Sequence, residues 1–107
     1  MNSINKVILV GRLGQEPKII NEQYATFSVA TSETWKDKST GERKESVEWT
    51  NIFVANPNLL SIVKLLQKGS LVYIEGKLRT RENNGQKMTD VVISQFDGQI
   101  QLLESKK

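Results

Sequence analysis

Short segments rich in valine, isoleucine and aromatic residues recur along the whole chain, and turn-forming residues separate them. β-Branched and aromatic side chains fit a pleated sheet, so this pattern predicts strands rather than helices. We expect strands at Ile4–Leu13, Tyr24–Thr31, Val47–Ala55, Leu71–Arg81, Met88–Phe96 and Gln99–Leu103. Between them we expect a polar turn at Gly14–Glu22, a long polar loop at Glu33–Glu45 and a hairpin turn at Asn83–Gly85.

One helix is expected between the third and fourth strands. Asn56 is a favourable cap, Pro57 suits the first turn, and Lys68-Gly69 ends the segment. Its apolar stripe consists of Leu59, Leu60, Val63 and Leu66. Apart from the last short strand, the order is three strands, a helix and two further strands, which is that of the OB-fold, a five-stranded Greek-key barrel with a helix between strands three and four. The sequence therefore predicts an all-β protein with one helix, in a single OB-fold domain over residues 1–107.

Alternation along the expected strands assigns side chains to faces. Ile52 and Val54 point to one face of their strand, and the opposite face carries Trp49, Asn51 and Phe53. In Leu71–Arg81, the residues expected to point inward are Val72, Ile74 and Leu78. The first strand is apolar on both faces, which predicts that one of its faces meets another subunit.

The composition excludes several kinds of chemistry. The chain has no cysteine and no histidine, so disulfides, thiolate or imidazole metal sites and histidine acid–base catalysis are impossible. We expect no cofactor and no metal, and the lack of disulfides fits an intracellular protein. The longest apolar run, Val7–Val10, is too short to span a membrane, and no signal peptide precedes it. The net charge is only +3, so the placement of the basic residues matters more than their number.

The segment Ser32–Trp49 reads SETWKDKSTGERKESVEW and places both tryptophans, Trp35 and Trp49, beside lysine and arginine. Unpaired bases stack on aromatic rings while cations neutralise phosphates, so this combination indicates binding of a single nucleic-acid strand. A second basic cluster covers Lys77–Arg81. Taken alone, the segment also fits a charged surface loop whose tryptophans anchor it to a core.

Several linked motifs resemble the bacterial single-stranded DNA-binding protein family, which includes mitochondrial relatives. NKVILVGRLGQEP at residues 5–17 resembles the opening strand of that family, and ATSETWKDKSTGE at residues 30–42 resembles its second strand and the following loop. Glu48-Trp49 matches the third strand, and KGSLVYIEGKLRTR at residues 68–81 matches the fourth. The motifs occur in the family's order and cover nearly the whole chain, which makes the resemblance specific.

The resemblance implies a homotetramer that wraps single-stranded DNA without sequence preference and catalyses nothing. It implies a role in DNA replication, recombination and repair. Carried over by position, Trp35 and Trp49 are expected to stack on bases. The basic residues expected along the DNA path are Lys6, Arg12, Lys36, Lys38, Lys44, Lys68, Lys77, Arg79 and Arg81. The expected location is the bacterial cytoplasm, with a mitochondrial or other organelle matrix as the alternative.

The chain departs from the family's pattern in three places. The family usually has two further stacking aromatics, at positions where this chain has Ala55 and Asn83. Bacterial members also carry a linker and an acidic tip that recruits partner proteins, whereas this chain ends in Ser105-Lys106-Lys107. We therefore expect no linker and no acidic tail, and no recruitment of partners through such a tip.

Phe53 is a further candidate for contact with DNA. It shares a strand face with Trp49, roughly 13 Å away along the strand, which suits separate bases of one DNA path. A contact between subunits is the alternative role for Phe53.

Three other functions compete with DNA protection. A primosome-type protein shares the fold and length but is a dimer that acts as a DNA and protein interaction module. A metal-dependent nuclease on the same barrel would need a carboxylate cluster, and the candidates are Glu33, Asp37, Glu42, Glu45 and Glu48. These alternate with lysine and arginine, which favours a solvated mixed-charge segment. A purely structural module would not bind oligonucleotides.

Overall fold

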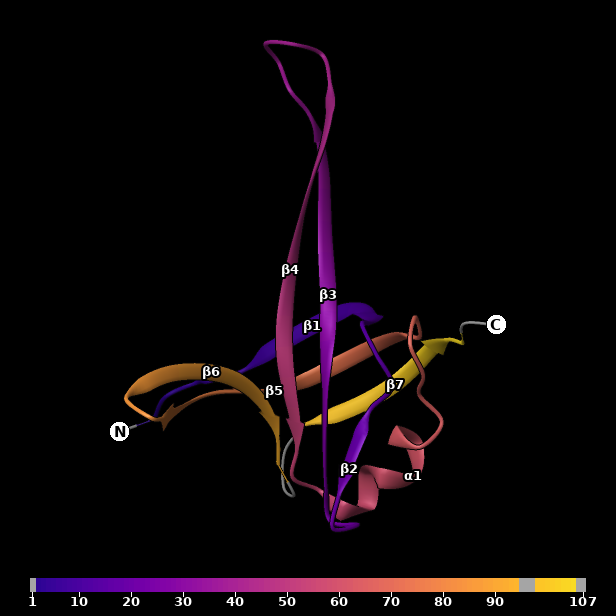
Figure 1. The fold of residues 1–107 in the computed structure, drawn as a ribbon, viewed down its shortest axis with the longest axis vertical. Helices are drawn as coiled ribbons and strands as arrows, with labels where there is room; N and C mark the ends of the chain where they lie inside the picture. The colour runs from indigo at the N-terminus through magenta and orange to yellow at the C-terminus, as the bar shows by residue number, and fades with distance from the viewer. Residues whose placement is uncertain (1, 95–97, 106–107) are drawn as a thin grey trace.

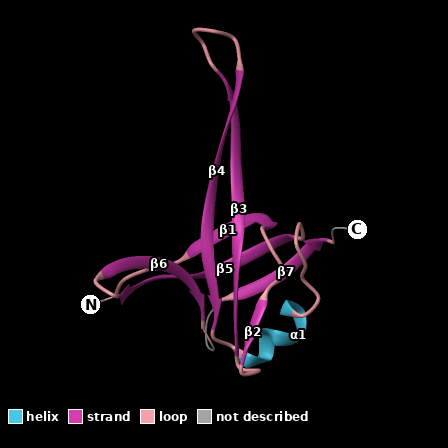
Figure 2. Cartoon of the chain, viewed as in Figure 1, coloured by secondary structure: helices cyan, strands magenta, loops and turns pink. Residues whose placement is uncertain are grey.

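The computed structural model describes residues 2–94 and 98–105. Within them it has seven strands: β1 (Val7–Leu13), β2 (Lys18–Ile20), β3 (Tyr24–Lys36), β4 (Arg43–Val54), β5 (Leu71–Asn83), β6 (Gln86–Ile93) and β7 (Gln99–Glu104). In the chain, a 3-10 turn, η1 (Pro57–Leu59), and a short helix, α1 (Leu60–Val63), follow each other between β4 and β5. In space, this helical segment lies at one end of the barrel (Figures 1 and 2).

Five of these strands form a closed barrel. They pair in the order β1-β3-β4-β6-β5, and a further pairing of β1 with β5 closes the circle. The β4–β6 pair is parallel, whereas the other pairs of the barrel are antiparallel. β2 pairs with β3 and β7 pairs with β5, outside the closed circle. The expected five-stranded OB-fold with a helix between its third and fourth strands is thus confirmed. The helix is shorter than expected, because α1 ends at Val63 and not at Lys68-Gly69.

The barrel interior is filled by alternate residues of its strands, as period-two side-chain geometry requires. Val29, Ile52, Val54, Val72 and Ile74 are all fully buried. Leu60, Val63 and Leu66 close one end of this core from the helical segment. Asn56 caps that segment as expected, because its side chain accepts a hydrogen bond from the backbone N–H of Asn58.

The expected loop at Glu33–Glu45 is wrong. β3 continues to Lys36 and β4 begins at Arg43, and twelve residue pairs from Ala25↔Val54 to Lys36↔Arg43 join the two strands. The distal half of this hairpin projects far beyond the barrel (Figure 1). We call residues 32–48 the arm. Backbone hydrogen bonds alone build its ladder, so a sequence without buried apolar residues can still form strands here.

Two other expectations need correction. The segment Gly14–Glu22 is not only a turn, because it contains the short strand β2. Leu78 does not point into the core, because its side chain is 52% exposed. The β1–β5 pairing ends at Val7↔Gly76, so Leu78 lies beyond the closed part of the barrel and has no opposite wall to pack against.

The hairpin turn between β5 and β6 is confirmed. Asn84 and Gly85 both have positive φ, which matches the two-residue turn that joins twisted strands. Two expectations fall outside the described residues: the end of the fifth expected strand at Phe96, and the basic terminus at Lys106-Lys107. In the described part, no helix is long and apolar enough to cross a bilayer.

Candidate nucleic-acid interface

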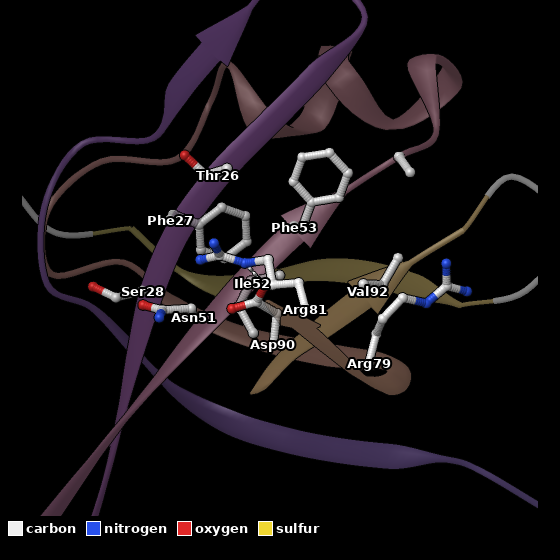
Figure 3. Close-up of a pocket in the computed structure, with 11 residues that line it drawn as sticks. Thr26, Phe27, Ser28, Asn51, Ile52, Phe53, Arg79, Arg81, Asp90 and Val92 are labelled. Atoms are coloured by element: carbon white, nitrogen blue, oxygen red, sulfur yellow. Dashed lines mark hydrogen bonds and ion pairs between the residues drawn. The ribbon is translucent and has the colours of Figure 1, made fainter. Parts of the chain in front are cut away.

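A groove of about 690 Å³ lies between the β3–β4 hairpin and the β5–β6 hairpin. Asn51 and Phe53 line it from β4, Arg79 and Arg81 from β5, and Asp90 from β6 (Figure 3). These residues come from two hairpins separated by the helical segment. The parallel pairing of β4 with β6 brings them together.

The strand registers explain how the groove is assembled. Thr26 pairs with Phe53, Phe53 pairs with Val92, and Val92 pairs with Lys77, so these four residues form one row across four strands. Paired residues share a face of the sheet. Lys77 therefore lies on the face that carries Phe53, two strands away from it. Arg79 lies two residues further along β5, on the same face. It is opposite Asp90 in the strand register and lines the same groove.

Trp49 lies on the same face of β4 as Asn51 and Phe53, as expected. Its side chain is 60% exposed, and it is paired with Ala30 of β3. The ring leans over Gly14, where a Cβ atom would lie only 2.4 Å from Cζ3 of the tryptophan. The residue after β1 can only be glycine if the ring keeps this position.

Trp35 lies far out on the arm, paired with Lys44, and its side chain is 48% exposed. On β3 it follows Ala30, the partner of Trp49, by five residues. An odd spacing on a strand reverses the side-chain direction. The two tryptophans therefore leave the ribbon on different sides, roughly 17 Å apart along its axis.

A smaller hollow of about 270 Å³ lies at the tip of the arm. Trp35, Lys36, Gly41 and Arg43 line it, so an aromatic ring and two cations meet there. The tip therefore repeats, at a smaller scale, the combination of ring and positive charge found in the groove.

Asp37 organises the turn at the end of the arm. Its carboxylate accepts a hydrogen bond from the Ser39 backbone N–H at 2.8 Å and faces the Lys44 ammonium at 3.3 Å. The Ser39 hydrogen bond, followed by that from Lys44, lowers the pKa of the Asp37 carboxyl below its ordinary value of 3.8. The turn therefore depends on a charged carboxylate.

Four of the nine basic candidates are engaged by carboxylates. Lys6 pairs with Glu75 at 3.4 Å and Arg12 with Glu104 at 2.8 Å, and Lys44 pairs with Asp37. Arg81 pairs with Asp90 at 2.6 Å, inside the groove. A phosphate that approaches these cations must compete with an acidic side chain already in place.

Four other basic candidates are not in ion pairs within the described residues: Lys36, Lys38, Lys68 and Arg79. Lys36 and Lys38 lie on the arm or at its tip, Arg79 lies in the groove, and Lys68 follows the helical segment. Their charges face solvent.

Sequence reasoning missed two residues of this region. Asp90 is 8% exposed, and its Oδ1 atom is buried with no hydrogen-bond partner in the described part of the chain. Tyr24 stacks on Phe53, with ring centroids 5.5 Å apart and an angle of 26° between the planes. Alternation gives the face of Tyr24, but only the β3–β4 register places it beside Phe53.

The carboxylates considered for a nuclease are spread along the arm. Glu33, Glu45 and Glu48 are paired with Ser46, Thr34 and Thr31, respectively. In the part of the chain that the structure describes, no group of three or more acidic side chains could hold a metal ion.

Comparison with known proteins identifies the family. The family model described as "Single-strand binding protein family" matches residues 4–103. The chain belongs to the single-strand binding protein family. Its membership confirms the resemblance of the strand motifs.

Individual members of the single-strand binding protein family resemble the chain over nearly its whole length. The single-stranded DNA-binding protein of Rickettsia felis is 44% identical over 114 aligned residues, which cover 97% of this chain and 75% of the relative. The structure of a Plasmodium falciparum SSB in complex with single-stranded DNA is 38% identical, with a TM-score of 0.85, over 97% of this chain and 98% of that one. The mitochondrial single-stranded DNA binding protein of S. cerevisiae is 25% identical, with a TM-score of 0.68, over 99% of this chain and all of that one.

Proposed function

We propose that this chain binds single-stranded DNA without sequence preference and protects it during replication, recombination and repair. The observation that carries the proposal is the groove between the two hairpins, which Arg79 lines, together with the exposed ring of Trp49 on the strand face of β4 that borders this groove (Figure 3). A ring and a cation together suit a base and its phosphate, whichever base is present. The DNA-bound structure of the Plasmodium falciparum relative supports this ligand.

In this proposal, Trp35 and Trp49 stack on bases. Lys36, Lys38, Lys68 and Arg79 form no ion pair within the described residues, so they neutralise phosphates first, since no carboxylate there must be displaced. Lys77 contributes from the row that contains Phe53. Each of four further cations contributes less, because a neighbouring carboxylate already neutralises part of its charge. These are Lys6, Arg12, Lys44 and Arg81.

Tryptophan emission titrated with oligo(dT) tests the proposal. We expect quenching, with a log–log salt dependence of roughly −0.7 for each phosphate neutralised. Trp49→Ala is expected to weaken binding by roughly 1–3 kcal/mol, and Lys38→Ala by less, because one exposed cation among several is screened by salt. Duplex DNA of the same length is the control. Equal affinity for duplex and single strand would disprove the proposal.

We also propose that the chain forms a homotetramer. Ile8 and Val10 on the outer face of β1 are 54% and 51% exposed, and Tyr73 lies beside Val10 on β5. Exposed apolar side chains in adjacent strands are typical of a surface that meets another subunit. Light scattering of the purified protein is expected to give four times the chain mass, and Val10→Glu is expected to lower it. A stable monomer in dilute solution contradicts this proposal, and a dimer favours the primosome-type alternative.

We propose a binding protein without a catalytic step. Its relatives are DNA-binding proteins, and the acidic residues of the arm alternate with basic ones. Single-stranded DNA incubated with the protein and Mg²⁺ is expected to remain intact, whereas cleavage would favour a nuclease.

The proposed location is the bacterial cytoplasm or an organelle matrix, in keeping with the Rickettsia felis and yeast mitochondrial relatives.

A further inference from the structure

Phe53 differs from the other phenylalanine that lines the groove. Phe27 is 7% exposed and belongs to the core, whereas Phe53 is only partly buried and points to the opposite face of its hairpin. A ring that only filled the core would be buried like Phe27. Phe53 instead presents part of its surface to the groove (Figure 3).

The other side of the Phe53 ring is covered by Tyr24. The centroids are 5.5 Å apart and the planes are 26° from parallel, so the two rings are stacked with an offset. Tyr24 opens β3 two residues before Thr26, which pairs with Phe53, so the contact is diagonal across the two strands. The stack restricts the rotation of the Phe53 ring and fixes the direction of its free face.

There is space for a planar group beside this free face. Ala55, which is small, lines the groove two residues further along, and Val92 is the partner of Phe53 on β6. Arg79 projects from the other side of the same groove (Figure 3). An apolar ring, an apolar floor and a cation that forms no ion pair within the described residues make a binding site for one nucleotide, with the base inside and the phosphate outward.

We infer that the groove face of Phe53 stacks on one unpaired base, and that Tyr24 is a positioning residue that holds the ring for this contact without touching the DNA. This inference rests on the proposed function, because it concerns the same ligand. It adds a third aromatic platform at a position where neither tryptophan reaches. Trp49 is four residues away on the same strand face, far enough for a different base.

Photo-crosslinking tests the contact directly. An oligo(dT) in which 5-iodouracil replaces some thymines forms adducts with aromatic side chains that stack on the halogenated base. After crosslinking, proteolysis and fragmentation, we expect adducts at Phe53 as well as at Trp49. Adducts at Trp49 with none at Phe53 would overturn the inference and leave the proposed function intact. Failure of the oligonucleotide to bind at all would instead count against the proposed function.

Variants test the role of Tyr24. Phe53→Leu is expected to weaken oligo(dT) binding roughly 5- to 150-fold, the cost of one lost stacking platform. Tyr24→Phe keeps the stacked pair, so affinity and the Phe53 adduct are expected to match the wild type. Tyr24→Leu removes the pair, and we expect a smaller loss of affinity together with fewer adducts at Phe53. The adduct at Trp49 should not change.

Controls separate this role from others. Light scattering and thermal unfolding on each variant check assembly and folding. If Phe53→Leu dissociates the assembly and leaves the affinity for short oligonucleotides unchanged, Phe53 is a subunit contact and the inference fails. If Tyr24→Phe loses as much affinity as Tyr24→Leu, the tyrosine hydroxyl contacts the DNA and the positioning role is wrong.

Discussion

The barrel and the arm are made from the same two strands but are held together differently. Within the barrel, β3 and β4 contribute the buried residues Ala25, Phe27, Val29, Ile52 and Val54. In the arm, every residue from 32 to 48 is exposed except Asp37, which is partly buried. Isolated two-stranded ribbons are at best marginally stable in water. The comparison shows that packing fixes the barrel, whereas a backbone ladder and one turn hold the arm, which leaves the ring of Trp35 and the cations of the arm available to a ligand.

The first prediction uses one substitution at two places on β4. Val54→Ala is expected to lower the free energy of unfolding by about 1.5–3 kcal/mol, because Val54 is completely buried. Val47→Ala, in the arm, is expected to cost less than about 1 kcal/mol, since this side chain is 43% exposed. Denaturant unfolding followed by circular dichroism measures both. Equal losses would mean that the arm is part of the cooperative core.

The second prediction concerns the ion pair in the groove of the barrel. Arg81→Ala leaves the Asp90 carboxylate buried without its partner at 2.6 Å, and we expect a loss of about 1–2 kcal/mol of stability. Asp90→Asn is expected to cost less, because the Arg81 side chain is 49% exposed and water can solvate it. Asp90→Asn should also tighten oligo(dT) binding, since Arg81 becomes free for phosphate. Thermal unfolding of both variants decides the ranking, and the reverse order would contradict it.

The third prediction separates the barrel from the arm during binding. Trp35→Phe leaves Trp49 as the only tryptophan, and Trp49→Phe leaves Trp35. Trp49, at the base of the arm beside the groove, is expected to be quenched by the shortest oligo(dT) that binds. Trp35 leaves the ribbon on a different side and roughly 17 Å further out, so its quenching should require longer oligonucleotides.

A series of oligo(dT) lengths titrated against both variants measures this difference. Phenylalanine retains a stacking face in each variant, so affinity should fall only modestly. Identical length dependence for the two tryptophans would mean that a short strand reaches both at once, which the arrangement on the ribbon does not allow.

The smallest predicted effect is confined to the tip of the arm. The pKa of Asp37 is lowered, so its stabilising contacts are present above 3.8 and are lost as the pH falls through the lowered value. Acidification below 3.8 is therefore expected to loosen the turn around Ser39. Trp35 emission in the Trp49→Phe variant reports the change, and Asp37→Asn should remove most of the pH dependence. A transition that coincides with barrel unfolding would contradict a local origin.

The sequence predicted the barrel well because buried strands leave an alternating apolar pattern. The faces of Trp49, Ile52, Phe53 and Val54 followed from alternation alone, and the structure confirms them. The strands of the arm were not predicted, because backbone hydrogen bonds form their ladder and the polar side chains show no alternating pattern that would indicate this pairing. Leu78 was placed inward because alternation cannot indicate where the opposite wall of a barrel ends.

The groove could not be predicted from the sequence, because the strand registers that assemble it leave no local sequence pattern. Asp90 and Arg81 meet through the β5–β6 register, and Phe53 reaches the same place through the parallel pairing of β4 with β6. The basic and aromatic residues were recognisable one by one. Which cations were already neutralised was not, because Lys6, Arg12 and Arg81 find their carboxylate partners on other strands.

The contact between Trp49 and Gly14 has a consequence for the entropy of binding. An exposed tryptophan on a flexible surface samples several rotamers and must give them up when a base stacks on it. Here the backbone of Gly14 lies close to the edge of the ring at Cζ3, at a distance that leaves no room even for a methyl group. The contact excludes orientations in which the ring would move towards Gly14, so a base that stacks on Trp49 removes less conformational freedom than it would from an unrestricted ring.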